Sequence, residues 1–201
     1  MQVGKVPKSA RERGRIAPAK FAHIVLRSPQ IDAMVDWYKT VLEAEVVFGD
    51  QMAVFLNYDD EHHRIGITNM PGLSAPTEMT AGTDHFAFTY ATVDDLFATY
   101  ERLRDLSIRP YWCINHGPTL SMYYRDPDQN RVELQIDVFD SIERINAWFE
   151  QSDFEVNPLG VKFDPEDLIQ RYRDGEALET LLDRPRIDRS ELPAQFPDPP
   201  T

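Results

Sequence analysis

Hydrophobic and polar residues follow one another along the first third of the chain in an order that predicts one strand, one helix and three more strands. Residues 20–27, KFAHIVLR, are rich in β-branched and aromatic residues, which is typical of a strand. Residues 31–42 place apolar side chains at helical spacing after a Ser28-Pro29 start signal. The three short strands are expected at 45–48, 52–57 and 63–68.

The same order of elements begins again after a segment rich in Pro, Gly and Thr at residues 70–83. A strand is expected at 84–90, a helix at 93–106, and further strands near 109–114, 120–125 and 131–137. A shift of 62 residues places His23 on His85, Asp32 on Asp94, Met34 on Leu96 and Tyr38 on Tyr100. Four matches at one offset predict a tandem βαβββ repeat. We therefore expect an α+β fold in which the two modules form one open mixed-sheet barrel.

The repeat divides the chain into four parts. Residues 20–138 form the paired βαβββ domain, with modules at about 20–70 and 83–138. Residues 1–19 predict a flexible basic arm, 139–184 a helical extension and 185–201 a Pro-rich tail. The extension contains expected helices at 140–151 and 164–182, the second broken at Gly175. It could cap the barrel or form a subunit contact, and we expect a homo-oligomer.

Charge and composition exclude several classes of function. The formal net charge is −13, so the chain repels phosphate backbones and nucleic acid is not an expected partner. No apolar run reaches the roughly 18–20 residues that a membrane span needs. Cys113 is the single cysteine, which rules out an intramolecular disulfide and favours a cytoplasmic location.

Three side chains of metal-ligand type lie at corresponding places in the repeat. His23 and His85 share one position on the two first strands, and Glu133 interrupts the apolar alternation of the last strand. If the modules pair about a pseudo-twofold axis, the histidines face one another and Glu133 completes the set. Two imidazoles and one carboxylate suit Fe(II), and Mn(II) is also accepted. Each residue alone is better explained as a packed histidine or a surface charge, but their shared positions favour a metal site.

The segments FAHIVLRS, DWYKTVL, TDHFAFTYATVDDLFATYERL and SMYYRDPDQNRVELQ resemble the vicinal-oxygen-chelate superfamily. The chain is most similar to the type I extradiol ring-cleavage dioxygenases, which act on catechols and biphenyl diols. The resemblance covers about residues 20–138, and YRDPDQNRVEL is its most specific part. It implies an oxidoreductase in which His23, His85 and Glu133 bind Fe(II), and in which a small aromatic diol reacts with O₂.

The same resemblance implies roles for residues around the metal. Tyr123, ten residues before Glu133, matches a tyrosine that contacts substrate. His116 resembles a loop histidine that contacts the diol, although its loop is shorter than usual. The acid/base histidine corresponds to His62 or His63: the family spacing favours His63, and strand alternation favours His62. Many members carry two such domains, whereas this chain has one.

Two other functions fit the same elements. A non-redox metalloenzyme of this fold, such as a glyoxalase or an epimerase, often uses a carboxylate from each module. Here Gly66 stands at the first-module position that corresponds to Glu133, which leaves three ligands and favours dioxygen chemistry. A resistance protein that binds a small molecule without metal generally lacks the His, His and Glu set. Trp112 could line an aromatic pocket, although core packing is the commoner role of tryptophan.

Overall fold

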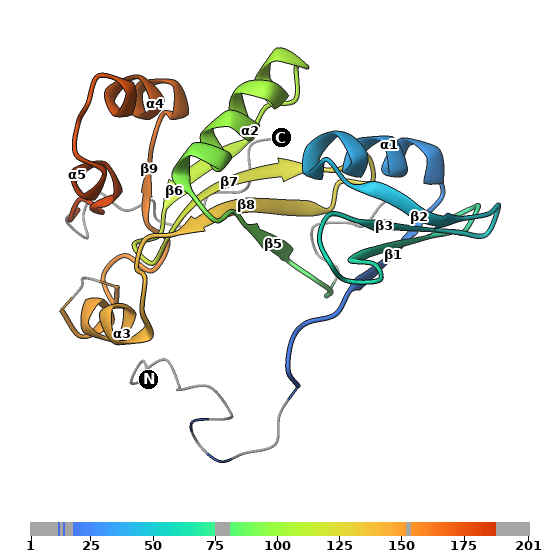
Figure 1. Ribbon diagram of the computed structural model, residues 1–201, viewed down its shortest axis with the longest axis horizontal. Coiled ribbons are helices and arrows are strands. Elements are labelled where there is room, and N and C mark those ends of the chain that lie inside the picture. Colours follow the sequence, from blue (N-terminus) through green and yellow to red (C-terminus); the bar gives the residue numbers. More distant parts are fainter. Residues whose placement is uncertain (1–11, 13, 15–17, 75–80, 152–153, 188–201) are drawn as a thin grey trace.

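The computed structural model describes residues 12, 14, 18–74, 81–151 and 154–187, so the expected basic arm and Pro-rich tail lie almost entirely outside the described residues. The first module forms a four-stranded sheet in the order β1-β4-β3-β2, with α1 packed on it (Figure 1). β1 runs parallel to β4, and the other pairs are antiparallel. The elements are β1 (Ile24–Ser28), α1 (Ile31–Leu42), β2 (Glu45–Gly49), β3 (Ala53–Asn57) and β4 (Ile65–Asn69).

The second module repeats this arrangement. Its elements are β5 (His85–Thr89), α2 (Val93–Asp105), β6 (Trp112–Asn115), β7 (Thr119–Arg125) and β8 (Arg131–Asp137). The extension adds α3 (Ile142–Gln151), β9 (Val161–Lys162), α4 (Pro165–Arg173) and α5 (Leu178–Leu182). β9 pairs with β6, so the second sheet has five strands in the order β5-β8-β7-β6-β9. The sequence predicted a helical extension. The structure differs in one short segment, β9, which joins this sheet.

The register of the strands shows which positions of the two modules are equivalent. Val25 of β1 lies opposite Gly66 of β4, and Ala87 of β5 lies opposite Glu133 of β8. Val25 and Ala87 are related by the same 62-residue shift that relates His23 to His85. Gly66 and Glu133 therefore occupy equivalent positions in the two sheets, as the sequence pattern predicts.

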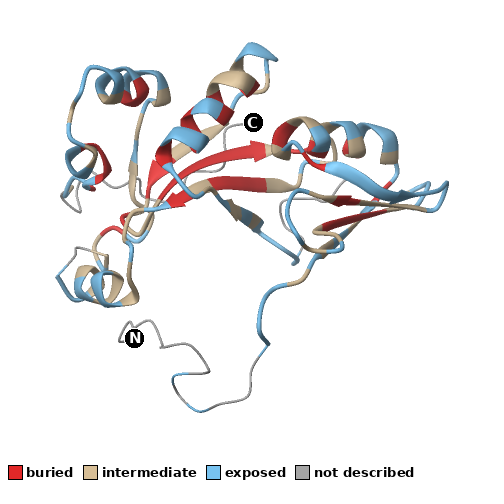
Figure 2. Ribbon diagram, in the orientation of Figure 1, coloured by how far each residue is buried: buried red, intermediate tan, exposed pale blue. Residues whose placement is uncertain are grey.

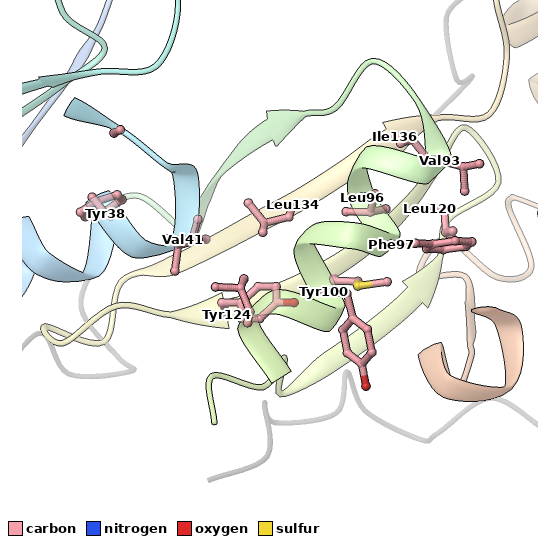
Figure 3. Packing of buried hydrophobic residues seen from close by; sticks show 14 of the residues in the cluster. Tyr38, Val41, Val93, Leu96, Phe97, Tyr100, Leu120, Tyr124, Leu134 and Ile136 are labelled. Atoms are coloured by element: carbon pink, nitrogen blue, oxygen red, sulfur yellow. The ribbon is translucent and has the colours of Figure 1, made fainter. Parts of the chain in front are cut away.

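Each long helix buries one apolar stripe against its own sheet. Met34, Tyr38 and Val41 of α1 are fully buried. On α2, Leu96 and Tyr100 pack over Leu134 and its neighbours in β8 and β7 (Figure 3). Helix periodicity sets this stripe, and burial of such side chains from water supplies the main stabilisation. Both helices lie on the same side of the molecule, and neither covers the opposite face of its sheet (Figure 1).

The two sheets do not close into one barrel, and on this point the expectation from the sequence was wrong. β1 and β5 are the edge strands of their own sheets, and no strand pairing joins them within the described ranges. Each pairs in parallel with the last strand of its own module, so its outer edge has no strand partner within the described residues. A cleft of about 560 Å³ separates them, lined by residues that include Val25, Asp84, His85 and Arg131.

Burial is uneven across the two sheets. β7 and β8 are buried over most of their length, whereas every residue of β2 is exposed (Figure 2).

Among the helices that the structure describes, none combines the length and the apolar character needed to cross a membrane.

Candidate functional site

The second sheet brings two of the expected metal ligands into direct contact. His85 begins β5, and Glu133 lies in the middle of the neighbouring strand β8. Nε2 of His85 is 3.1 Å from Oε2 of Glu133. Glu133 is only 4% exposed, whereas His85 keeps an exposed edge toward the cleft. An imidazole nitrogen and a carboxylate oxygen thus converge at the sheet face opposite to α2.

Each member of this pair alters the pKa of the other. The hydrogen bond with Glu133 raises the pKa of His85 to about 9, and Asp84, whose Oδ1 lies 2.7 Å from Nδ1, adds to this effect. Burial by itself would raise the pKa of Glu133, but hydrogen bonds from His85 and Ser121 outweigh it and hold that pKa below its ordinary value. Glu133 is therefore an ionised carboxylate at neutral pH in spite of its burial.

Tyr123 and His116 form a second pair beside the first. Tyr123 lies opposite Glu133 in the β7–β8 register, and its ring centroid is 5.4 Å from that of His85. Its hydroxyl is 3.0 Å from Nε2 of His116, which follows the end of β6. Trp112 of β6 packs on the Tyr123 ring with a centroid separation of 4.9 Å. Four of the side chains expected at the site, His85, Glu133, Tyr123 and His116, therefore form one connected group on the face of the second sheet.

Burial governs the ionisation of this second pair. It raises the pKa of Tyr123 well above the ordinary value, and the charge of Glu133 acts in the same direction. It also lowers the pKa of His116 below the ordinary value, although the hydrogen bond with the Leu159 carbonyl opposes this. At neutral pH Tyr123 is therefore a phenol and His116 an uncharged imidazole.

His23 lies in a different group, on the first module. Its ring stacks on His63 at a centroid distance of 4.4 Å and contacts His62 edge-on at 6.1 Å. One ligand atom from each of these three histidines lies within 4.8 Å of the others. Within the described residues this is the only group of three or more such side chains at that spacing. The structure therefore groups His23 with His62 and His63, whereas His85 and Glu133 form a separate contact.

The two candidate acid/base histidines differ in their surroundings. The His63 ring lies between His23 and Phe55, with the Phe55 centroid at 4.7 Å. Burial lowers its pKa, and the charges of His23 and His62 add to this effect. The His62 side chain is 66% exposed and faces Glu61, while its Nδ1 is 2.6 Å from that of His63. The His63 ring is packed between two other rings whereas the His62 ring is exposed, and this difference favours His63 as the candidate acid/base residue.

Comparison with known proteins identifies the family of the chain. Residues 20–134 match the family model of the glyoxalase/bleomycin resistance protein/dioxygenase superfamily. The chain belongs to this superfamily. The matched residues include His23, His85 and Glu133, and they end before the C-terminal extension begins.

Two curated members of the superfamily resemble the chain over most of its length. Biphenyl-2,3-diol 1,2-dioxygenase 2 of Rhodococcus globerulus is 41% identical over 166 residues, which cover 82% of this chain and 87% of that protein. Biphenyl-2,3-diol 1,2-dioxygenase 3 of the same organism is 41% identical over 167 residues, with coverages of 82% and 88%. Among solved structures, a glyoxylase/bleomycin resistance protein/dioxygenase domain from Frankia sp. EAN1pec shares the fold, with a TM-score of 0.51 and 18% identity over 60% of this chain and 99% of that one.

Several groups that contact the candidate site residues Glu133 and His116 were not expected from the sequence. Ser121 donates to Glu133, and the Leu159 carbonyl and Arg184 both contact His116. Leu159 and Arg184 belong to the extension, far from His116 along the chain. No sequence motif surrounds Leu159 or Arg184. A contact made by a backbone carbonyl does not depend on the residue type, so a sequence pattern cannot predict it.

Proposed function

We propose that the protein is an Fe(II)-dependent extradiol dioxygenase that cleaves the ring of a catechol-type aromatic diol with O₂. The observation that carries the proposal is the contact of the buried Glu133 carboxylate with His85, beside Tyr123 and His116. The 41% identity to two biphenyl-2,3-diol 1,2-dioxygenases supports the same substrate class.

His23, His85 and Glu133 are the proposed metal ligands. The donors fit the ion, because Glu133 stays ionised although buried and Nε2 of His85 lies beside it; His85 would release its proton when the ion binds. His23 would supply the ligand from the first module, across the cleft between β1 and β5. Two imidazoles and one carboxylate also accept Mn(II).

Bound Fe(II) would supply open coordination positions for the diol and O₂ and would lower the pKa of a coordinated phenol. The chain's own residues would do the remaining work. His63, an imidazole with a lowered pKa, would accept a proton from the diol at neutral pH and later return it. Tyr123 and His116 would orient the diol through their linked hydroxyl and ring nitrogen.

The side chains around the pair suit a flat apolar ring. Tyr123 contacts His85 edge-on, and the tilted ring of Trp112 packs on Tyr123. In the other module, Phe48 and Phe55 lie 5.6 Å apart and continue the stack that includes His63. Aromatic rings of a substrate pack favourably on such surfaces, which supports a diol with one or two rings.

The test is purification without oxygen, followed by metal analysis and by addition of catechol and of a biaryl diol in air. We expect about one Fe(II) per chain, since one ligand set is proposed, and the yellow ring-opened product. A stoichiometric metal without product would point to a non-redox metalloenzyme of the same fold. A chain without metal would refute the ligand assignment and favour a small-molecule-binding protein.

A matched pair of variants distinguishes the loss of a carboxylate at the proposed site from the same loss elsewhere in the chain. Glu133→Gln should lose both the metal and the activity, because a neutral amide replaces the ionised ligand. Glu143→Gln, an equivalent change in the first turn of α3, should retain both. An iron-loaded and active Glu133→Ala protein would refute the assignment.

A further inference from the structure

Both ring nitrogens of His116 have partners, and the partners differ in kind. Nδ1 faces the backbone carbonyl of Leu159, and Nε2 lies 3.0 Å from the hydroxyl of Tyr123. A carbonyl oxygen only accepts hydrogen bonds, so Nδ1 must carry the hydrogen. The burial that lowers the pKa of His116 keeps the ring neutral. Nε2 is then an acceptor to which the Tyr123 hydroxyl can donate, and the Glu133 carboxylate is the other acceptor within reach of that hydroxyl.

A short turn in the extension holds the Leu159 carbonyl in place. The Asn157 side chain is fully buried, and its Oδ1 accepts from the backbone amides of Leu159 at 3.2 Å and Gly160 at 2.9 Å. Its Nδ2 donates to the Gly160 carbonyl at 2.9 Å. Gly160 has φ +114, and a Cβ there would lie 2.3 Å from the Asn115 carbonyl oxygen. Only glycine therefore allows the turn to approach the strand that leads to His116.

The backbone on both sides of His116 is tied to the extension as well. Asn115 pairs with Val161 of β9, and its Nδ2 donates to the Leu182 carbonyl at 2.9 Å. Arg184 is buried and donates to the carbonyls of His116 at 3.3 Å and Asn157 at 3.0 Å. The extension thus fixes the main chain of His116 as well as the ring orientation.

We propose that Asn157 is a positioning residue, which acts through His116 by holding it in the Nδ1–H tautomer. In this tautomer the bare Nε2 can accept the Tyr123 proton, which leaves the lone pairs of the phenol oxygen able to accept from a substrate hydroxyl. A diol hydroxyl could then donate to Tyr123 while Tyr123 donates to His116. The opposite tautomer would place a ring lone pair against the Leu159 oxygen and would reverse the Tyr123 hydrogen bond. The relay rests on the proposed function, whereas the tautomer does not.

The tautomer can be measured in the full chain with ¹⁵N-labelled histidine and without metal or substrate. Long-range ¹H–¹⁵N spectra distinguish a protonated ring nitrogen from a bare one, and His116→Gln assigns the signals. We expect protonated Nδ1 and bare Nε2 in the wild type. Asn157→Ala should show both tautomers, and Arg171→Ala, in the exposed ion pairs of α4, should match the wild type. Asn157→Ser provides a milder change, because serine can still accept from one turn amide.

Ring cleavage provides the second measurement. With the holoenzyme, we expect roughly a 10-fold or larger fall in kcat for the Asn157 variants and a much smaller change in KM, because misdirected groups slow the reaction more than binding. A wild-type ring with bare Nδ1 would overturn the proposal. So would an Asn157 variant that loses activity but keeps the Nδ1–H tautomer, or one that changes tautomer but keeps full activity. Absence of ring cleavage in the wild type would refute the proposed function alone.

Discussion

At the scale of single residues, the stacking of His63 separates it from its neighbour. Its ring packs between His23 and Phe55, whereas His62 is largely exposed. We expect His63→Gln to lower kcat by about 10²- to 10⁴-fold, the usual contribution of a general acid/base. His62→Gln should lower it by less than about 10-fold, since it changes only an adjacent contact. Steady-state kinetics on both iron-loaded variants check this, and equal losses would contradict it.

The ionisation of His116 gives a second prediction at this scale. Burial lowers the pKa of His116 from its ordinary value of 6.5, so protonation requires more acid than for a free imidazole. The neutral ring is fully present above pH 6.5 and is lost only as pH falls through the lowered pKa. NMR titration of the metal-free chain should give a His116 midpoint below 6.5. A midpoint at or above that value would show that the ring is not desolvated as the fold implies.

At the scale of elements, local periodicity predicted more than long-range pairing did. The helix expected at 31–42 is α1, Ile31–Leu42, and the helix expected at 93–106 is α2, Val93–Asp105. Apolar spacing records which face a helix buries, so these elements are readable from sequence. β9 could not be found in this way, because two residues carry no period. Closure of the barrel depends on how two edge strands approach, which no local pattern encodes.

The turn between β6 and β7 gives a test of how α3 packs. Gly117 has φ +101, and a Cβ there would lie 2.0 Å from Cζ2 of Trp148. Gly117→Ala should lower the free energy of unfolding by about 2 kcal/mol, from backbone strain together with the clash. In a Trp148→Ala background the same change should cost about 1 kcal/mol, because only the strain remains. Urea denaturation of the four proteins measures this coupling, and additive costs would contradict the contact.

At the scale of the whole molecule, side chains rather than strand pairing hold the modules together. The Tyr38 hydroxyl donates to the buried Asp126 carboxylate at 3.0 Å, and Arg102 of α2 donates to the Val41 carbonyl of α1 at 3.2 Å. The repeat predicted candidate ligands in both modules, because each has a place within its own module. The structure groups His23 with His62 and His63 and joins His85 to Glu133, an arrangement that depends on the angle between two sheets that share no strand pairing within the described residues.

A metal ion that takes ligands from both modules should therefore stabilise the whole chain. An ion that binds only the folded state at 100 times its Kd adds about 2.7 kcal/mol to the free energy of unfolding. We expect this gain for the wild type with Fe(II) under anaerobic conditions, and its removal by a chelator. His23→Gln and His85→Gln should each lose the gain, because each removes a ligand from one module. His62→Gln should keep it.

The same variants distinguish the proposed site from the cluster of His23, His62 and His63. If His62→Gln loses the gain and His85→Gln keeps it, the ion binds the three histidines of the first module and the His85–Glu133 contact is an ion pair alone. If His85→Gln loses the gain and His23→Gln keeps it, the second module binds the ion without the first. Only loss in both His23→Gln and His85→Gln requires the modules to approach across the cleft, and denaturation with and without Fe(II) measures each difference within a single variant.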